Sequence, residues 1–244
     1  MSLADHLHPE VRLIREHAAG LLALEKPSGI RSHPNDGGVA DEGALLTLPY
    51  DEAAEAYLDG GARYFLLNRL DAPTSGLILL ATDAQVAAEV KARFAGRDVQ
   101  KTYLAVVKGR LARPQERWSD KLLTQTRQGQ LRTITSPRGE PALCEARQLK
   151  QSQTQPLLSL IELQPHTGRT HQLRVQCASR HLPIVGDATY GDFRYNREFA
   201  KKYGEKRLLL HAAAVKLEFK AGGKAHHFEA QCAMPTAMQV PFMK

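Results

Sequence analysis

Two apolar runs separated by one short turn constrain the fold of this 244-residue chain more than any other feature. Residues 64–67 and 77–81 are apolar, and the segment between them reads Asn-Arg-Leu-Asp-Ala-Pro-Thr-Ser-Gly. We predict strand, loop and strand, with the loop at the end of a buried sheet. A carboxylate there, that of Asp71, can be held rigidly and still meet a substrate. Alternatively, Asp71 is an ordinary turn residue that accepts backbone N–H bonds.

The other apolar patterns predict strands and helices without regular alternation. Strands are expected at 21–29, 101–109, 142–149, 157–163, 208–219 and 227–231, with hairpins in 111–140. Helices are expected at 51–58 after Asp51, at 82–96 from a Thr82/Gln85 capping box, at 170–180 after Thr170, and at 196–203 from Asn196 to Gly204. This order predicts an α+β fold with a largely antiparallel sheet.

The charge of the chain favours a polyanionic partner. Lysines and arginines number 33 against 26 acidic residues, which gives a net charge of +7 and an isoelectric point near 9.4. Acidic residues crowd the first third, whereas basic residues cluster at 93–101, 169–181 and 194–207. Since charge clusters are often only solvated surface, their functional meaning stays open at this point.

Several classes of site and location are disfavoured by the sequence. There is no G-x-S-x-G, G-x-G-x-x-G or P-loop pattern. The widely spaced cysteines predict buried thiols in a reducing compartment, the cytoplasm, and the histidine spacing fits no zinc motif. We expect no metal, no membrane span and no signal peptide. The residues concerned are Cys144, Cys177, Cys232, His166, His171 and His181.

Five segments resemble, in order, motifs of the RluA family of RNA pseudouridine synthases. The central stretch resembles the family signature His-Arg-Leu-Asp-x-x-Thr-Ser-Gly-Leu. The others read Glu-Lys-Pro-Ser-Gly (25–29), Lys-Thr-Tyr-Leu-Ala-Val-Val-Lys-Gly (101–109), Gly-Arg-Thr-His-Gln-Leu-Arg-Val with Pro-Ile-Val-Gly-Asp (168–175, 183–187) and Leu-Leu-Leu-His-Ala (208–212). The resemblance implies one catalytic domain, residues 1–244, with a long mixed, mostly antiparallel sheet flanked by helices and loops. It also implies isomerisation of specific uridines to pseudouridine in tRNA or rRNA, without metal or organic cofactor.

The resemblance assigns catalytic roles to three positions. Asp71 matches the aspartate of covalent catalysis, because breaking the C1′–N1 bond and rejoining through C5 needs a nucleophile or base near the sugar. Attack on the base, attack on C1′ and removal of a sugar proton all stay open. Arg174 matches the arginine that pairs with this aspartate. Tyr103 matches a tyrosine that stacks on the base and takes part in proton transfer at C5.

Other positions match substrate contacts. Arg69 matches the arginine that helps displace the target nucleotide from its helix, and Leu173 and Ile184 are expected to line the uracil pocket. Contacts with the RNA backbone are expected from Arg169, Arg194, Arg197, Lys201 and Lys202. Two positions depart from the family pattern: Asn68 stands where His is usual, and His181 where Gly is common.

The chain has only some 20 residues before the first motif, so we expect no N-terminal S4-type RNA-binding domain. Target choice is then expected from the catalytic domain itself, at the polar and basic segments 111–140 and 192–207. A monomer is the default expectation. Two alternatives stay open, namely a catalytically inactive relative that binds or folds RNA, and an unrelated basic hydrolase that uses Asp71 and a histidine.

Overall fold

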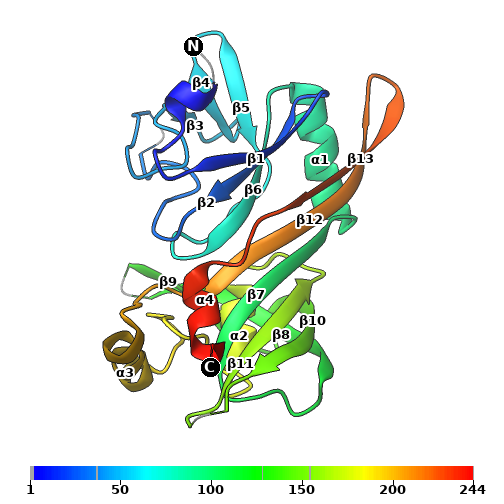
Figure 1. Ribbon diagram of the computed structural model, residues 1–244. Helices are drawn as coiled ribbons and strands as arrows, with labels where there is room; N and C mark the ends of the chain where they lie inside the picture. The colour runs from blue at the N-terminus through cyan, green and yellow to red at the C-terminus, as the bar shows by residue number, and fades with distance from the viewer. Residues whose placement is uncertain (1–2, 37, 128, 154, 244) are drawn as a thin grey trace. The chain divides into compact units, whose positions relative to one another are not determined.

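A computed structural model describes residues 3–36, 38–127, 129–153 and 155–243 of the chain (Figure 1). The chain forms two compact units, each assembled from two separate segments. Unit 1 comprises Met1–Gln100 and Ala212–Cys232, and unit 2 comprises Lys101–His211 and Ala233–Lys244. Each unit combines antiparallel strands with helices, which confirms the predicted α+β class. That residues 1–244 act as a single catalytic domain stays a prediction.

Unit 1 is a sheet in which β2 and β6 are neighbours, with Leu21 opposite Ala81 and Lys26 opposite Gly76. Its 3-10 helix is η1 (Leu3–His6) and its α-helix is α1 (Ala84–Gly96). Its strands are β1 (Arg12–His17), β2 (Leu21–Lys26), β3 (Tyr50–Asp51), β4 (Ala56–Asp59), β5 (Ala62–Leu66), β6 (Ser75–Ala81), most of β12 (Leu210–Ala221) and β13 (Lys224–Gln231).

The two central strands of unit 1 are buried on both faces, and this explains their continuous apolar sequences. All seven residues of β6 are buried. Because side chains alternate across a strand, Leu77 and Leu79 face α1 and β12, whereas Ile78 and Leu80 face the opposite cluster around Tyr57. The turn after residue 67 therefore emerges from a sheet that is covered on both sides.

The strands of unit 2 are antiparallel: β11 pairs with β7 and β10, and β8 pairs with β10 and β9. Its strands are β7 (Gln100–Lys108), β8 (Gln115–Arg127), β9 (Gln130–Thr135), β10 (Glu140–Gln151) and β11 (Leu158–Pro165). Its helices are α2 (Gln172–Ala178), α3 (Phe193–Tyr203), α4 (Thr236–Gln239) and the 3-10 helix η2 (Val240–Phe242).

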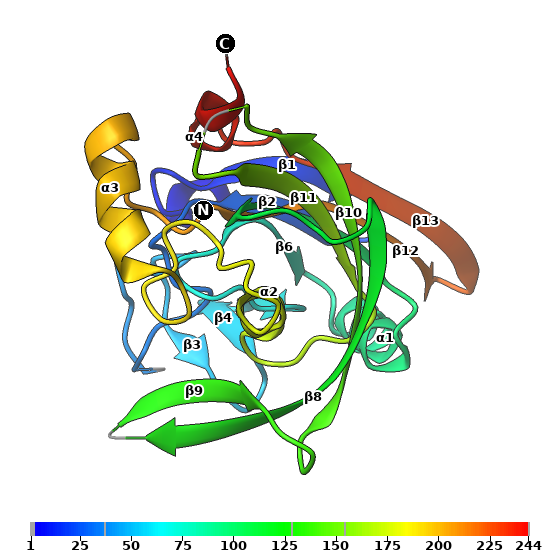
Figure 2. The ribbon, with the colours of Figure 1, turned by 90° about the horizontal axis from the view of Figure 1, so that it is seen from below.

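The two largest apolar clusters of unit 2 lie on opposite faces of its strands. One contains Trp118, Ile161 and Leu173, so α2 packs on that face of the sheet. Figure 2 shows α2 within the curve formed by β8, β10 and β11. The other contains Val106, Phe199 and Met238, which places α3 and α4 on the opposite face. Strands β7 and β11 contribute to both clusters, because their apolar side chains alternate between the two faces, as in unit 1.

The predicted helix at 51–58 is wrong. The segment forms a hairpin in which Tyr50 pairs with Tyr57 and Asp51 with Ala56. Asp51 does accept backbone N–H bonds, from Ala53 and Ala54 at 3.0 Å each, but it caps a turn and not a helix. Asp51 would make the same local bonds at the start of a helix. The hairpin forms because its second strand, β4, pairs with β5.

The other helices exist, but their predicted N-caps are wrong. Asp83 rather than Thr82 caps α1, with its Oδ1 accepting from Gln85 N at 2.8 Å. Asp192 rather than Asn196 caps α3, and Gly204 ends it as predicted. The helix expected after Thr170 begins at Gln172, with His171 at the cap position. The predicted strands and the hairpin within 111–140 are confirmed.

The helices among the described residues are all too short or too polar to span a lipid bilayer.

Candidate active site

Asp71 lies half-buried on a turn between β5 and β6. Thr74 N donates to the Asp71 carbonyl at 2.9 Å, so the turn is closed by a backbone hydrogen bond. Gly76 ends the turn at φ +113°, and a Cβ there would collide with the backbone of Ala212 in β12. The predicted turn chemistry around Asp71 is therefore present, and close packing beneath it fixes where β6 begins.

A buried lysine supports this turn from below. The Lys26 side chain is fully buried, and its Nζ donates to the carbonyls of Pro27, Ile30 and Ala72 at 2.9, 2.7 and 3.0 Å. Lys26 pairs with Gly76 in the ladder, which brings the ammonium group under the residues that follow Asp71. Three carbonyl acceptors compensate for the loss of water around a buried charge.

Two serines connect the turn to remote segments of unit 1. Ser32 Oγ donates to Leu70 O at 2.8 Å and accepts from Leu70 N at 3.0 Å, so it satisfies both backbone groups of the residue before Asp71. Ser28 Oγ donates to Pro73 O at 2.7 Å. Contacts from two loops thus hold both sides of the Asp71 position.

Asn68 extends the ladder between β5 and β6. Its side-chain Oδ1 accepts from Leu79 N at 2.7 Å, while Leu67 N donates to Leu79 O at 3.0 Å. The Asn68 side chain therefore takes the place of a backbone carbonyl acceptor for Leu79 N, at the point where the chain leaves β5. The sequence did not indicate what Asn68 does in place of the usual histidine, and this contact gives its structural role.

Arg69 is exposed at the entrance of the same turn. Burial raises the pKa of Tyr50 to about 12, with Glu55 adding to the rise and the positive charge of Arg69 opposing it. An exposed guanidinium two residues before Asp71 fits the predicted contact with a displaced nucleotide, which stays a prediction.

In unit 2, Arg174 on α2 forms a two-point ion pair with Asp187. Arg174 Nε lies 2.8 Å from Asp187 Oδ2, and Nη2 lies 2.8 Å from Oδ1. Burial disfavours the Asp187 charge, but the hydrogen bonds and positive charge of Arg174 outweigh it and lower the pKa of this carboxyl. Asp187 Oδ1 also accepts from Thr189 N and Tyr190 N, which leaves this loop tightly closed.

Tyr190 covers one face of the Arg174 guanidinium, with Cζ 5.2 Å from the ring centre. Its hydroxyl accepts from Thr133 N at 2.9 Å and lies 2.8 Å from His171 Nδ1. Arg174 is thus fixed by α2, by the loop after Ile184 and by β9. The sequence did not assign roles to Asp187, Tyr190 and His171, although Asp187 and His171 lie within the third motif block.

Tyr103, Leu173 and Ile184, which the sequence placed around the base, do lie in one cluster of unit 2. Tyr103 is half-buried on β7 opposite Leu163, whereas Leu173 and Ile184 are buried. On the same face of β7, burial lowers the pKa of Lys101, whose Nζ lies 3.4 Å from Thr167 O. The two aliphatic side chains are placed to support the tyrosine ring. Their contact with uracil stays a prediction.

The basic residues that were expected to contact RNA differ in their interactions within the protein. Arg169 forms an ion pair with the exposed Glu140 and donates to Pro141 O at 3.3 Å. Arg194 pairs with Glu198 along α3 at 3.2 Å. Arg197, Lys201 and Lys202 are exposed. Arg174 with its family partner Asp71 would join residues of different units, and that pairing stays a prediction.

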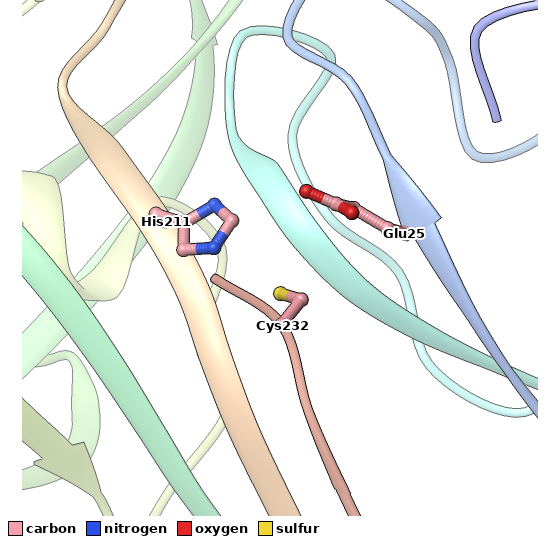
Figure 3. A group of neighbouring side chains, drawn as sticks. All are labelled: Glu25, His211 and Cys232. Atoms are coloured by element: carbon pink, nitrogen blue, oxygen red, sulfur yellow. The ribbon is translucent and has the colours of Figure 1, made fainter. Parts of the chain in front are cut away.

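A cysteine next to a carboxylate lies elsewhere in unit 1. Figure 3 shows Glu25 on β2 and Cys232 after β13; the third labelled residue, His211, belongs to unit 2. Burial raises the pKa of the Cys232 thiol to about 12, and the Glu25 charge adds to the rise. In the absence of a metal ion, a thiol in this state stays protonated at neutral pH and is a poor nucleophile.

Comparisons with known proteins identify the fold and the family of the chain. Human RNA pseudouridylate synthase domain containing 1 superimposes with a TM-score of 0.70 at 20% identity, over 95% of this chain and 87% of the human one. The fold is therefore that of RNA pseudouridylate synthase domains. A family model described as RNA pseudouridylate synthase matches residues 20–179, which include Asp71, Tyr103 and Arg174.

Curated relatives agree with this match. The tRNA pseudouridine synthase C of Vibrio cholerae is 33% identical over 207 residues, which cover 80% of this chain and 81% of the relative. The protein of that name from Pectobacterium carotovorum is 32% identical over 225 residues, and the alignment covers 88% of this chain but 57% of the relative. The chain belongs to the RluA family of RNA pseudouridine synthases, enzymes that isomerise uridine to pseudouridine in RNA.

Proposed function

We propose that the Asp71 turn of unit 1 and the Arg174 cluster of unit 2 serve one reaction, the isomerisation of uridine to pseudouridine in tRNA. The observation that carries the proposal is that hydrogen bonds from three side chains fix the turn on which Asp71 lies. The half-buried Asp71 carboxylate stands on a turn that is fixed by the side chains of Lys26, Ser32 and Asn68. Each of these side chains forms a hydrogen bond with the backbone of the turn or of the adjoining strand. Such preorganisation is expected of a catalytic group and is more than a turn aspartate requires.

In the proposed reaction the C1′–N1 bond of uridine breaks, the uracil turns, and a C1′–C5 bond forms. C5 loses its proton and N1 gains one, so the atoms balance without an external reactant. Asp71 supplies the nucleophile or base near the sugar. Tyr103 stacks on the base and its hydroxyl takes part in proton transfer at C5. Arg174, fixed by Asp187, is assigned the role of the family arginine that pairs with this aspartate.

Substrate recognition is assigned to further positions. Arg69, exposed beside Asp71, fills the space that the flipped nucleotide leaves, and Leu173 and Ile184 support the uracil pocket. Arg169 contacts the RNA backbone after exchanging its Glu140 partner for phosphate. We propose tRNA rather than rRNA as the substrate because the curated relatives are named tRNA pseudouridine synthase C. We further propose that the enzyme acts in the cytoplasm as a monomer.

The test is pseudouridine mapping on unmodified tRNA and rRNA transcripts. The wild-type protein should form pseudouridine at a defined tRNA position, and Asp71→Asn should form none while still binding RNA. Asp98→Asn, which changes an exposed aspartate of the same unit, is the matched control and should keep full activity.

The same experiment decides between the alternatives. Product from the Asp71→Asn protein would refute the assigned chemistry. RNA binding by both proteins without product from either would favour an inactive relative that binds RNA. Absence of RNA binding would instead reopen the assignment of an unrelated enzyme.

A further inference from the structure

Helix α3 presents an exposed face that combines one aromatic ring with several cations. Phe193, Arg197 and Lys201 follow one another at i, i+4 and i+8, so they lie on one side of the helix, with Arg194 beside them. Phe193 is 53% exposed, although large apolar side chains are mostly buried elsewhere in unit 2. The opposite side of α3, with Tyr195 and Phe199, packs into the core of unit 2.

The cations on this face are available for a ligand. Arg194 is paired only with Glu198 on the same helix, in an exposed i, i+4 contact. Within the described part of the chain, the side chains of Arg197 and Lys201 make no ion pair or hydrogen bond. Glu198 is the one acidic residue of α3. Exposed cations without carboxylate partners produce a positive potential that attracts a polyanion.

Helix α3 is also attached firmly to the loop that holds Arg174. Asn196 Oδ1 accepts from Gly186 N at 2.9 Å, and Asn196 Nδ2 donates to Asp187 O at 3.0 Å. At its N-terminus Asp192 caps the helix and pairs with Lys108 of β7 at 2.6 Å. Both ribbon views show α3 at the outside of the unit 2 strands (Figures 1 and 2). A partner bound on α3 is therefore in a fixed position relative to Arg174.

We propose that the exposed face of α3 is a docking surface for the substrate RNA, in which Arg194, Arg197 and Lys201 contact phosphates and Phe193 stacks on an unpaired base. The proposal rests on the proposed function. Charge complementarity favours RNA, and alternating cations and an aromatic ring are typical of single-stranded or looped nucleic-acid contacts. A membrane surface fits less well, because Phe193 is the one large apolar side chain exposed on this helix.

The experiment measures RNA binding separately from activity. Arg197→Gln/Lys201→Gln is compared with Arg63→Gln/Lys150→Gln, which removes the same charge from exposed positions on β5 and β10, outside the segments expected to select the target. Binding of a tRNA transcript is measured by filter retention over a salt series. The α3 pair should raise Kd about tenfold near physiological salt and reduce the slope of log K against log salt by about 1.5. The control pair should change neither by more than about twofold.

Phe193→Ala gives an independent check. Loss of a stacked base should raise Kd about tenfold but leave the salt slope unchanged, because no charge is removed. With saturating RNA, kcat of both α3 variants should equal that of wild type while KM rises, since neither variant touches the reacting base. Circular dichroism checks that the variants keep the secondary structure of the wild-type protein. The substitutions leave the buried residues of α3 unchanged.

The outcomes separate this proposal from the proposed function. Unchanged Kd and salt slope in the α3 pair, or equal losses in the control pair, would overturn the docking surface. Binding of wild type to anionic phospholipid vesicles that is lost in the α3 pair, with RNA binding intact, would assign the face to a membrane. Absence of pseudouridine from wild type would refute the function alone, because the docking result depends on binding.

Discussion

Arg174 and Asp187 form a buried ion pair whose two contacts are both 2.8 Å long, with the side chains 5% and 1% exposed. The bidentate geometry fixes the plane of the guanidinium as well as its position. Because Asp187 in turn accepts from Thr189 N and Tyr190 N, the orientation of Arg174 depends on the loop after Ile184. We therefore regard Asp187 as a positioning residue for the proposed catalytic arginine.

Asp187→Asn should destabilise the protein and abolish most activity. Removing the Asp187 charge breaks the two-point ion pair of a buried guanidinium, for which a loss of about 3–5 kcal/mol of unfolding free energy is expected. Urea unfolding measures the stability, and single-turnover assays measure the chemical step. Asp192→Asn is the control, because it also disrupts an ion pair but a half-exposed one, and should lose about 1 kcal/mol or less.

The Asp187 pair also predicts acid sensitivity. The folded pKa of this carboxyl is lowered below its ordinary 3.8. Its contribution to stability is therefore fully present above pH 3.8 and is lost as the pH falls through the lower folded pKa. The unfolding free energy of wild type should decrease across this acid window, and Asp187→Asn should lack that part of the decrease. Parallel curves for the two proteins would contradict the assignment.

The sequence predicted the strands well because their signal is local. Residues 77–81 are buried on both faces, and a continuous apolar run has few other places in a folded protein. The capping residues were harder to predict. Asp51 makes the same backbone bonds in a turn that it would make at a helix start, so only its pairing with Ala56 reveals the hairpin.

The candidate site was predicted through resemblance rather than through local pattern. Asp71, Tyr103 and Arg174 stand within recognisable motifs, but nothing in their spacing shows their partners. The contacts that hold them join residues far apart in sequence: Lys26 meets Ala72, and Thr133 meets Tyr190. Asn196 was expected to cap a helix, yet its side chain joins α3 to the backbone of Gly186 and Asp187. Such pairings depend on the tertiary fold, which a single sequence does not reveal.

Lys26→Met should lower both stability and activity. The substitution keeps an apolar stem of similar length but leaves the carbonyls of Pro27, Ile30 and Ala72 without their shared donor. A loss of about 3 kcal/mol is expected, because each buried acceptor loses a charged hydrogen bond. Lys91→Met breaks an ion pair with Glu55 at the surface and should cost about 1 kcal/mol or less. Equal losses in the two variants would show that Lys26 has no special role.

The native protein should resist thiol alkylation. Burial raises the pKa of Cys144 and of Cys232 to about 12, and also raises that of Cys177. Since only the thiolate reacts, iodoacetamide at about pH 8 should modify each at least about 100-fold more slowly than an exposed cysteine. Mass spectrometry of the intact protein follows the reaction. The urea-unfolded chain, in which all three thiols should react rapidly, is the control.

Asn68 gives the most specific test of how the Asp71 turn is mounted. Its Oδ1 accepts from Leu79 N at 2.7 Å, so Asn68→Ala should leave this N–H without its partner and reduce stability by about 1–2 kcal/mol. Because the contact lies where the chain leaves β5 for Asp71, kcat should fall while KM stays near the wild-type value. Asn68→Asp keeps an acceptor oxygen in place and should preserve the stability that the alanine variant loses. Full kcat in Asn68→Ala, measured in single-turnover assays, would show that the Asp71 turn holds its geometry without this side chain.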